Sequence, residues 1–198
     1  MRKAIRLFDK GLRHALGVFE FCEAPDCLLR VRVTIAPHNL ALQGWAVPKG
    51  VPILELHLWN EHIPPLPPSG PDLVWAVQVR RRLTVSFQTL ADQVQRDPRF
   101  ANVQAVGGIT VLLSPGSDPG GEKLFQRLGF RVFPYHNPLG SFGEFWENFY
   151  SWWIMWAFNP ATLRHRRLIG LQRSEVWMPI DEFISRKWVS KKERLICQ

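Results

Sequence analysis

DLVWAVQVRRRLTVSFQTLADQVQRDPRFANVQAVGGITVLL, residues 72–113 of this chain of 198 residues, predicts a long helix followed by a buried strand. After Asp72, which is suited to cap a helix, apolar residues recur with helical spacing to about Gln95. The pair Asp97-Pro98 then ends the helix. Val103 to Leu113 predicts the strand, and the glycine pair inside it marks a bulge or a close approach of another backbone.

Shorter patterns on either side extend this unit into a sheet. Residues 28–36 and 51–59 are rich in β-branched or alternating apolar residues and predict two more strands. A short helix over 122–128, a strand over 131–133 and a last helix starting near Pro179 follow. Strand, helix and strand in this order predict a right-handed parallel crossover. We therefore expect an α+β (α/β-like) fold, with a central mixed sheet of about four or five strands flanked by helices.

The most unusual segment is FGEFWENFYSWWIMWAF, residues 142–158, in which nine of seventeen residues are aromatic. The aromatic residues follow helical spacing, and apolar residues extend around more than one face. So much aromatic surface must be covered by a core, a partner, a ligand pocket or a membrane interface. We expect its apolar face to form part of the main core, with Phe149 and Trp153 nearly buried.

The net charge of +8 is concentrated at the two ends of the chain. Residues 1–21 form a predicted amphipathic helix with net charge +3, residues 22–163 are neutral, and residues 164–198 carry +5. This helix either packs on the single domain, which spans 1–198, or lies on a membrane surface. If the ends converge, they form one basic face for lipid or nucleic-acid phosphates. The alternative is an ordinary solubilising surface. The face would contain Arg2, Lys3, Arg6, Arg164, Arg166, Arg167, Lys191 and Lys192.

Cysteine usage and hydropathy limit where the protein acts. Three cysteines, an odd and sparse set, argue against a disulfide framework and favour a reducing compartment. The N-terminal segment lacks the uninterrupted apolar core of a secretory signal, and no run is long enough to span a bilayer. We therefore expect a cytoplasmic protein, either free or peripheral at the inner face of the membrane.

The cluster HLWNEH, residues 57–62, contains the best candidates for chemistry. On a strand, His57 and Glu61 would share a face, with Asn60 or His62 at the rim of any site. The catalytic candidates are His57, Glu61 and His62, and the alternative is a strand end whose polar residues enter a loop. No third metal ligand accompanies them, so neither a metal site nor a cofactor is predicted. The candidates for ligand binding are Trp59, Asn60, Trp153 and Asn159.

Two further patterns fail the requirements of nucleotide or nucleic-acid sites. GSDPGGEK, residues 116–123, has an acid after its second glycine and no serine or threonine after its lysine, unlike a phosphate-binding loop. The run Arg80–Arg82 fans around a helix, and no recognised nucleic-acid-binding signature accompanies it. We therefore do not expect nucleic acid as a partner.

Several short motifs, taken in order, resemble the YkoP-like domain, a bacterial family of uncharacterised function found alone or fused to polysaccharide deacetylase domains. The resemblance covers roughly residues 25–190. The metal-binding motifs of the deacetylase are not recognisable, so the resemblance implies an accessory domain linked to polysaccharide or cell-envelope metabolism. The motifs are HLWNE (57–61), Arg80–Arg82 with Ser86, GGIT (107–110), LGF (128–130), Asn159-Pro160 and WMP (177–179).

The helix from Asp72, the strand at Val103 and LFQRLGF (124–130) also resemble the second half of a GNAT acetyltransferase. Those enzymes hold the CoA pyrophosphate with a glycine-containing turn that opens a helix. The corresponding stretch here, RRRLTVSFQTL, has no glycine, which puts acetyl transfer in doubt. The leading hypothesis is a non-catalytic domain that binds an apolar or anionic ligand, such as an anionic lipid or an envelope-related small molecule. Its alternatives are a divergent GNAT-like acyltransferase and, more weakly, a nucleic-acid-binding protein.

Overall fold

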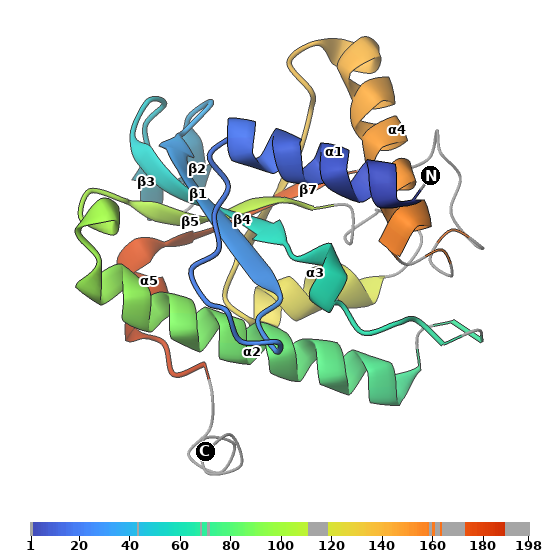
Figure 1. Ribbon diagram of the computed structural model, residues 1–198. Helices are drawn as coiled ribbons and strands as arrows, with labels where there is room; N and C mark the ends of the chain where they lie inside the picture. The colour runs from blue at the N-terminus through green and yellow to red at the C-terminus, as the bar shows by residue number, and fades with distance from the viewer. Residues whose placement is uncertain are drawn as a thin grey trace.

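The computed structural model describes residues 2–42, 44–67, 69–70, 72–110, 119–158, 160, 163 and 173–188. Within these residues, helices cover both faces of a mixed five-stranded sheet, and a two-stranded hairpin extends from it (Figure 1). The α+β fold class and the size of the sheet are confirmed. No helix in the described part of the chain is both long and apolar enough to cross a membrane.

The strands of the main sheet do not follow chain order. The two central neighbours β4 and β5 run parallel, and every other neighbouring pair is antiparallel. The parallel pair is possible because helix α2 returns the chain along the sheet between the two strands. The spatial order is β1 (Leu29–Ile35), β4 (Pro52–Leu58), β5 (Ala105–Thr110), β7 (Ser174–Pro179) and β6 (Arg131–Pro134).

Two features of this sheet go beyond the sequence-based expectations. The expected strand at 131–133 is β6, which runs parallel to β5, but β7 lies between them and pairs with both. The hairpin of β2 (Leu40–Leu42) and β3 (Trp45–Val47) was also not expected. Strands this short carry too few residues to show an alternating pattern.

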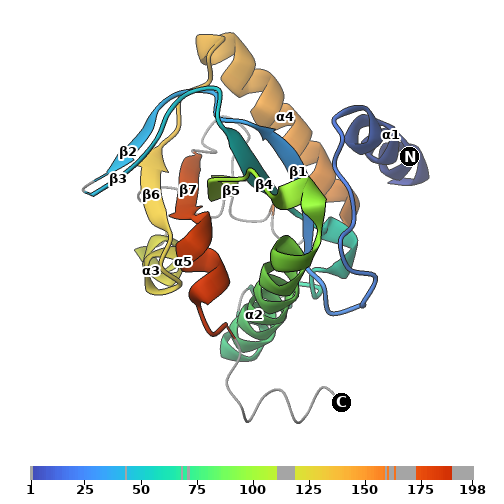
Figure 2. The same ribbon diagram turned by 90° about the vertical axis from the view of Figure 1, so that its left-hand side faces the viewer.

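One face of the sheet carries the main core beneath α2 (Leu73–Arg96), α3 (Pro119–Arg127) and α5 (Ile180–Ser185) (Figure 2). Asp72 caps α2 by accepting a hydrogen bond from the Trp75 backbone, as expected from its residue type. Gly129, with φ of +89°, lies two residues after the last residue of α3, where a left-handed conformation ends a helix. The centre of this core is Phe87, whose ring contacts Phe130, Phe183 and Trp188.

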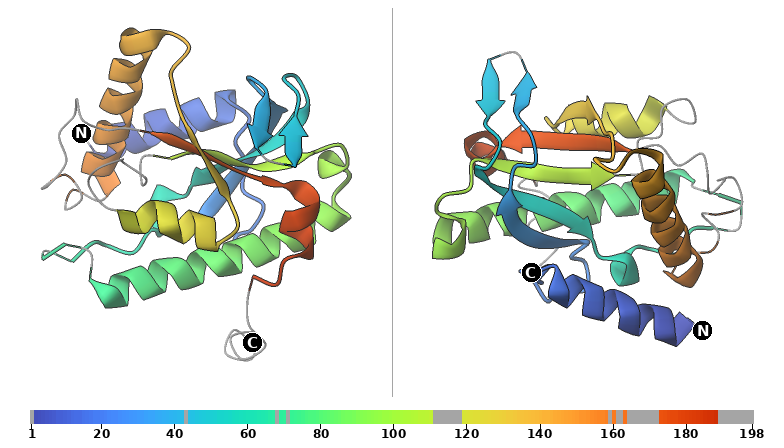
Figure 3. Two further views of the ribbon diagram at one scale, coloured as in Figure 1. Left: turned by 180° about the vertical axis from the view of Figure 1, so that it is seen from behind. Right: turned by 90° about the horizontal axis from the view of Figure 1, so that it is seen from above.

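The opposite face carries the hairpin, α1 (Arg2–Ala15) and α4 (Gly140–Phe158) (Figure 3). The N-terminal helix is therefore packed on the domain, although it ends at Ala15 rather than near residue 21. Helices α1 and α4 meet through Ile5, Ile154 and Ala157, which form a small apolar cluster separate from the main core. Two short 3-10 helices, η1 (Asn60–His62) and η2 (Pro98–Phe100), complete the described elements.

The expectation that the aromatic helix joins the main core is wrong. Phe149 is 38% exposed and Trp153 is only partly buried. The inward side of α4 instead carries small and polar residues, including Ala157 and Asn148. Small residues allow close contact with α1, and hydrogen bonds satisfy the polar ones, so this side faces inward although other sides are more apolar.

Strands β4 and β5 separate toward their carboxyl ends. Only residues 53–55 of β4 pair with residues 105–107 of β5, although the strands continue to Leu58 and Thr110. Helix α4 lies beside the carboxyl end of β5, and α1 lies along the same face of the sheet (Figure 3). The diverging strand ends and these two helices therefore surround the region in which the candidate site lies.

Candidate functional site

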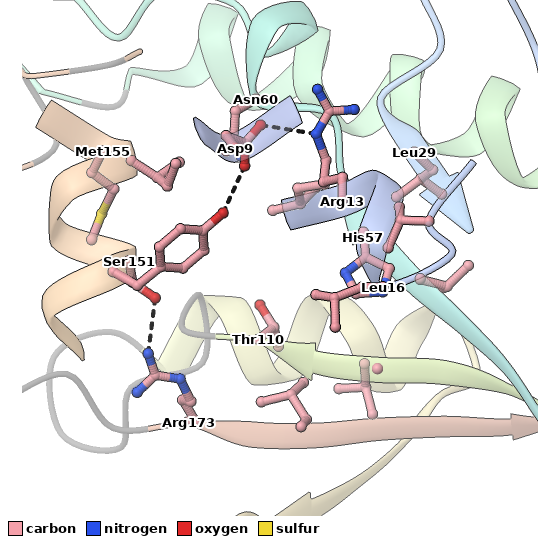
Figure 4. A pocket seen from close by; sticks show the side chains of 18 of the residues that line it. Asp9, Arg13, Leu16, Leu29, His57, Asn60, Thr110, Ser151, Met155 and Arg173 are labelled. Carbon is pink, nitrogen blue, oxygen red and sulfur yellow. Dashed lines mark hydrogen bonds and ion pairs between the residues drawn. The ribbon is translucent and has the colours of Figure 1, made fainter. Parts of the chain in front are cut away.

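A cavity of about 370 Å³ lies between the separating ends of β4 and β5 and the helices α1 and α4 (Figure 4). Through the gap between these strands it also reaches Leu83 and Phe87 of α2 and Phe125 of α3. Its volume lies within the range of small-molecule sites. Most of its lining is apolar, with a small number of polar side chains from different elements, which is the usual composition of a ligand pocket. The apolar lining includes Leu12, Leu16, Leu56, Ile109, Ile154 and Val176.

Asp9, Arg13 and Tyr150 connect the two helices across the cavity wall. The Tyr150 hydroxyl donates a hydrogen bond of 2.7 Å to Asp9 Oδ1, and Arg13 Nε donates one of 2.9 Å to Asp9 Oδ2. Asp9 is 4% exposed, so its carboxylate needs these partners to remain buried. This network fixes the position of α1 against α4 and neutralises the only acid in α1.

Both tyrosines of the chain should resist ionisation while the protein is folded. Burial, followed by the adjacent Asp9, raises the pKa of Tyr150, and burial with Glu147 raises the pKa of Tyr135. A raised folded pKa means that this stabilisation is present below about pH 10, the unfolded value, and is lost as the pH rises further. We expect tyrosinate absorbance to appear only with unfolding, and Tyr150→Phe to reduce the loss of stability above that pH. Titration of the native protein near the unfolded pKa would contradict this.

Of the two arginines that line the cavity, Arg173 is the more buried. Its guanidinium donates to Asn148 Oδ1 and, over 2.8 Å, to Ser151 Oγ on α4 (Figure 4). The side chain is only 7% exposed, and burial lowers its pKa against the opposing effect of Glu147. Arg173 Nε lies 3.7 Å from Glu147 Oε2, too far for a hydrogen bond. The guanidinium is therefore ion-paired with Glu147 without a hydrogen bond, and an anionic group in the cavity would add acceptors for its N–H groups.

His57 occupies the end of β4 and lines the cavity from the sheet side. Its Nε2 is buried, has no hydrogen-bond partner among the described residues and lies 3.7 Å from Glu55 Oε2. Burial raises the pKa of Glu55, but His57 and Arg32 outweigh this effect, so the pKa lies below its ordinary value. Arg32 Nε donates a 2.9 Å hydrogen bond to the same carboxylate. His57 is thus backed by an ionised carboxylate.

The structure separates the six residues of the predicted cluster 57–62. His57 and Asn60 line the cavity. Glu61 does not share a strand face with His57, because β4 ends at Leu58 and the chain turns into η1. Glu61 instead binds Arg30, with 3.2 Å between Oε2 and Nη1.

His62 and Trp59 both have packing partners at this junction. The His62 ring stacks on Trp59 with centroids 3.8 Å apart, and its Nδ1 hydrogen-bonds to the carbonyl of Cys27 over 2.8 Å. The guanidinium of Arg30 lies over the Trp59 ring, 4.2 Å from its centroid. These contacts hold η1 against the start of β1, so we assign Trp59, Glu61 and His62 a structural position rather than a place in the cavity wall.

The remaining predicted residues lie on the outer surface or outside the described part of the chain. Trp153 contacts Phe8 and Phe149 and does not line the cavity. The predicted ligand residue Asn159 and most of the predicted basic face fall outside the described residues, so the convergence of the ends remains a prediction. These residues are Asn159, Arg164, Arg166, Arg167, Lys191 and Lys192.

Sequence reasoning did not select the polar residues that the fold brings to the cavity. Asp9 is the only acid in α1 and stands four residues before Arg13, a spacing that signals a pair on one helix face. Tyr150 and Ser151 are polar positions within an otherwise apolar stretch of α4. Nothing local distinguishes Arg173, because its partners Asn148 and Ser151 lie more than 20 residues earlier in the chain.

Metal ligation has no support in this site. Among the described residues, no group of three or more His, Cys, Asp or Glu side chains is placed to hold a metal ion. Burial raises the pKa of Cys27 to about 11, and its thiol donates to the Leu29 carbonyl. Because the thiolate is the form that binds metals, this cysteine is unsuited to that role.

Comparison with known proteins identifies one family whose model covers most of the chain. The model of the family described as the YkoP domain matches residues 6–187, which include every residue that lines the cavity. No curated protein and no solved structure matches the sequence. Because the family model covers most of the chain, from α1 through α5, the chain belongs to the YkoP domain family.

Proposed function

We propose that this domain binds a small amphipathic molecule, with an anionic head and a short apolar chain, in the cavity between α1, α4 and the sheet. The observation that carries the proposal is the position of Arg173, a buried cation at the edge of a mainly apolar cavity. An anionic head would accept hydrogen bonds from this guanidinium, and the leucine- and isoleucine-lined part would accept the apolar chain.

The dimensions of the cavity limit the ligand. At roughly 30 Å³ per atom, the share of one water molecule in the liquid, the volume corresponds to about a dozen non-hydrogen atoms. A short alkyl phosphate or a medium-chain carboxylate is of this size, whereas a complete phospholipid is much larger. We infer that the ligand is an envelope-related small molecule or a single acyl or prenyl-type chain, met in the cytoplasm or at the inner face of the membrane.

The GNAT-like alternative receives less support from the helix that follows β4. In this chain, η1 and a proline-rich loop separate β4 from α2, and α2 begins with the Asp72 cap. The stretch that corresponds to the glycine-containing turn, RRRLTVSFQTL, lies inside α2, where the backbone amides are hydrogen-bonded within the helix and cannot bind a pyrophosphate. The geometry therefore favours binding over acyl transfer, and it offers nothing that favours nucleic acid.

Octyl phosphate is the direct probe, titrated below its micelle-forming concentration by isothermal calorimetry. We expect it to bind more tightly than octanol or octyltrimethylammonium, because only the phosphate accepts hydrogen bonds from Arg173 and also carries negative charge. Arg173→Met should weaken octyl phosphate binding by about 10- to 100-fold, since a hydrogen bond to a charged group contributes about 1.5–3 kcal/mol. Arg173→Lys retains the charge and should recover part of the affinity.

The matched control is Lys123→Met, which removes an exposed cation on α3 on the other side of the sheet. This variant should bind octyl phosphate like the unmodified protein. Equal affinity for octanol and octyl phosphate would refute an anionic head. Selective thermal stabilisation by acetyl-CoA, with no response to octyl phosphate, would replace the proposal with the acyltransferase alternative.

A further inference from the structure

An exposed aromatic surface covers the outer sides of α1 and α4. We define it as Leu7 and Phe8 of α1 with Phe142, Phe145, Trp146 and Phe149 of α4. Their exposed fractions run from 38% at Phe149 to 73% at Leu7, and Leu139, just before α4, is 71% exposed. Large apolar side chains gathered in this way mark an interaction site rather than ordinary surface.

Ring contacts join the two helices into one continuous surface. Along α4, Phe145 and Phe149 lie 6.5 Å apart between ring centroids, and Phe149 and Trp153 lie 6.1 Å apart. Trp153 then contacts Phe8 of α1 at 5.9 Å. These rings contact one another, and all but the partly buried Trp153 are exposed among the described parts of the chain.

The charge beside this surface is positive. Helix α1 contains five Lys and Arg residues and a single acid, and that acid, Asp9, is buried and paired with Arg13. Helix α4 has two acids, of which Glu147 accepts from Tyr135 and faces Arg173. Glu144 is thus the one exposed acid of α4. Aromatic residues beside a strongly basic helix complement a partner surface that has an anionic outer layer and an apolar interior.

We propose that the aromatic surface docks on an anionic phospholipid bilayer. Tryptophan and phenylalanine enter the boundary between head groups and acyl chains, and the basic residues of α1 other than the paired Arg13 contact lipid phosphates. A second copy of the chain is a poorer occupant, because a twofold contact would bring two α1 helices of like charge together.

This proposal does not require the ligand proposed for the cavity. The inward sides of α1 and α4 line the cavity, and the outward sides form the aromatic surface. Docking would therefore place the cavity directly behind the two helices that touch lipid. The two functions depend on different residues, so each can be removed without the other.

Vesicle sedimentation tests the proposal, with vesicles of phosphatidylglycerol and phosphatidylcholine compared with pure phosphatidylcholine at low and high salt. We expect binding to the anionic vesicles that weakens with salt, because exposed charges are screened within about 10 Å. The double variant Phe142→Ser/Trp146→Ser should reduce partitioning by about tenfold or more, because less apolar surface is then transferred from water into the bilayer. Lys3→Gln/Lys10→Gln should reduce it by about fivefold for each charge, and only on anionic vesicles.

The matched control is Leu73→Ser/Val74→Ser, which removes two exposed apolar residues of α2 on the opposite side of the sheet. This control should partition like the unmodified protein, and Phe142→Ser/Trp146→Ser should keep its affinity for octyl phosphate. Absence of binding at low salt, or unchanged binding of the Phe142→Ser/Trp146→Ser variant, would overturn the proposal. So would a dimer in light scattering that the same variant dissociates. Arg173→Met should still bind vesicles, which separates this result from failure of the ligand site.

Discussion

Replacing Phe87 by alanine is expected to lower the free energy of unfolding by about 3–5 kcal/mol. Phe87 is 1% exposed and lies where α2, α5 and the segment after α3 meet. Its ring contacts Phe130 at 5.5 Å, Phe183 at 5.9 Å and Trp188 at 4.7 Å between centroids. Three rigid rings contact Phe87 and its remaining side lines the cavity of the candidate site, so the space left by the lost ring is not refilled. Urea denaturation of both proteins measures the difference.

Phe142→Ala is the control for this substitution, because the same side chain is removed at a position that is 68% exposed. We expect a change within about 0.5 kcal/mol, as for most surface substitutions. Phe149→Ala, at 38% exposure, should also fall well below the Phe87 value. A larger loss at Phe149 than at Phe87 would place the main core beneath α4, against the structure.

Replacing Gly107 by alanine should destabilise the protein by about 3 kcal/mol, the upper end for forcing an atom into a packed interior. A Cβ at this position would lie 1.9 Å from the carbonyl oxygen of Val176 and 2.5 Å from the Trp177 ring. Both neighbours belong to β7, which pairs with β5 through backbone hydrogen bonds, so neither can move without opening the sheet. The expected result is a lower denaturation midpoint or loss of soluble folded protein.

Gly11→Ala provides a matched control with the opposite sign. Gly11 lies in α1, and a Cβ there would meet nothing within 4 Å. Alanine forms helix better than glycine by about 1 kcal/mol, so this variant should be as stable as the unmodified protein or more stable. Equal effects of Gly107→Ala and Gly11→Ala would show that the contact between β5 and β7 does not limit residue size at position 107.

Gly107 illustrates which parts of the fold the sequence could predict. The pair inside an apolar strand indicated a close approach of another backbone, and the structure confirms it. The partner, β7, was not predicted, because a six-residue strand near the end of the chain has no alternation that separates it from a loop or a short helix. Long patterns, such as the helix of 24 residues that begins after Asp72, were predicted within one residue of both ends.

The candidate site shows the same division. Two of the predicted residues, His57 and Asn60, line the cavity, because a polar residue at the end of an alternating strand already indicates the edge of a sheet. Arg173 was not predicted, since its role depends on Ser151 and Asn148 of another element. Asp9 is comparable, because its partner Tyr150 lies 141 residues later in the chain.

The sequence by itself determined the features that depend on interactions between residues close in the chain. These are helix periodicity and capping, strand alternation, the stop at Gly129 and the amphipathic character of α1. Only the tertiary structure decided which side of α4 is buried. That helix is apolar on several sides, so its own periodicity does not select one side. The choice was made by Arg173, which satisfies two polar groups of α4, and by Ala157, which lets α1 approach closely. The aromatic side remained exposed because buried polar groups must be hydrogen-bonded, whereas exposed aromatic rings lose only part of their burial energy.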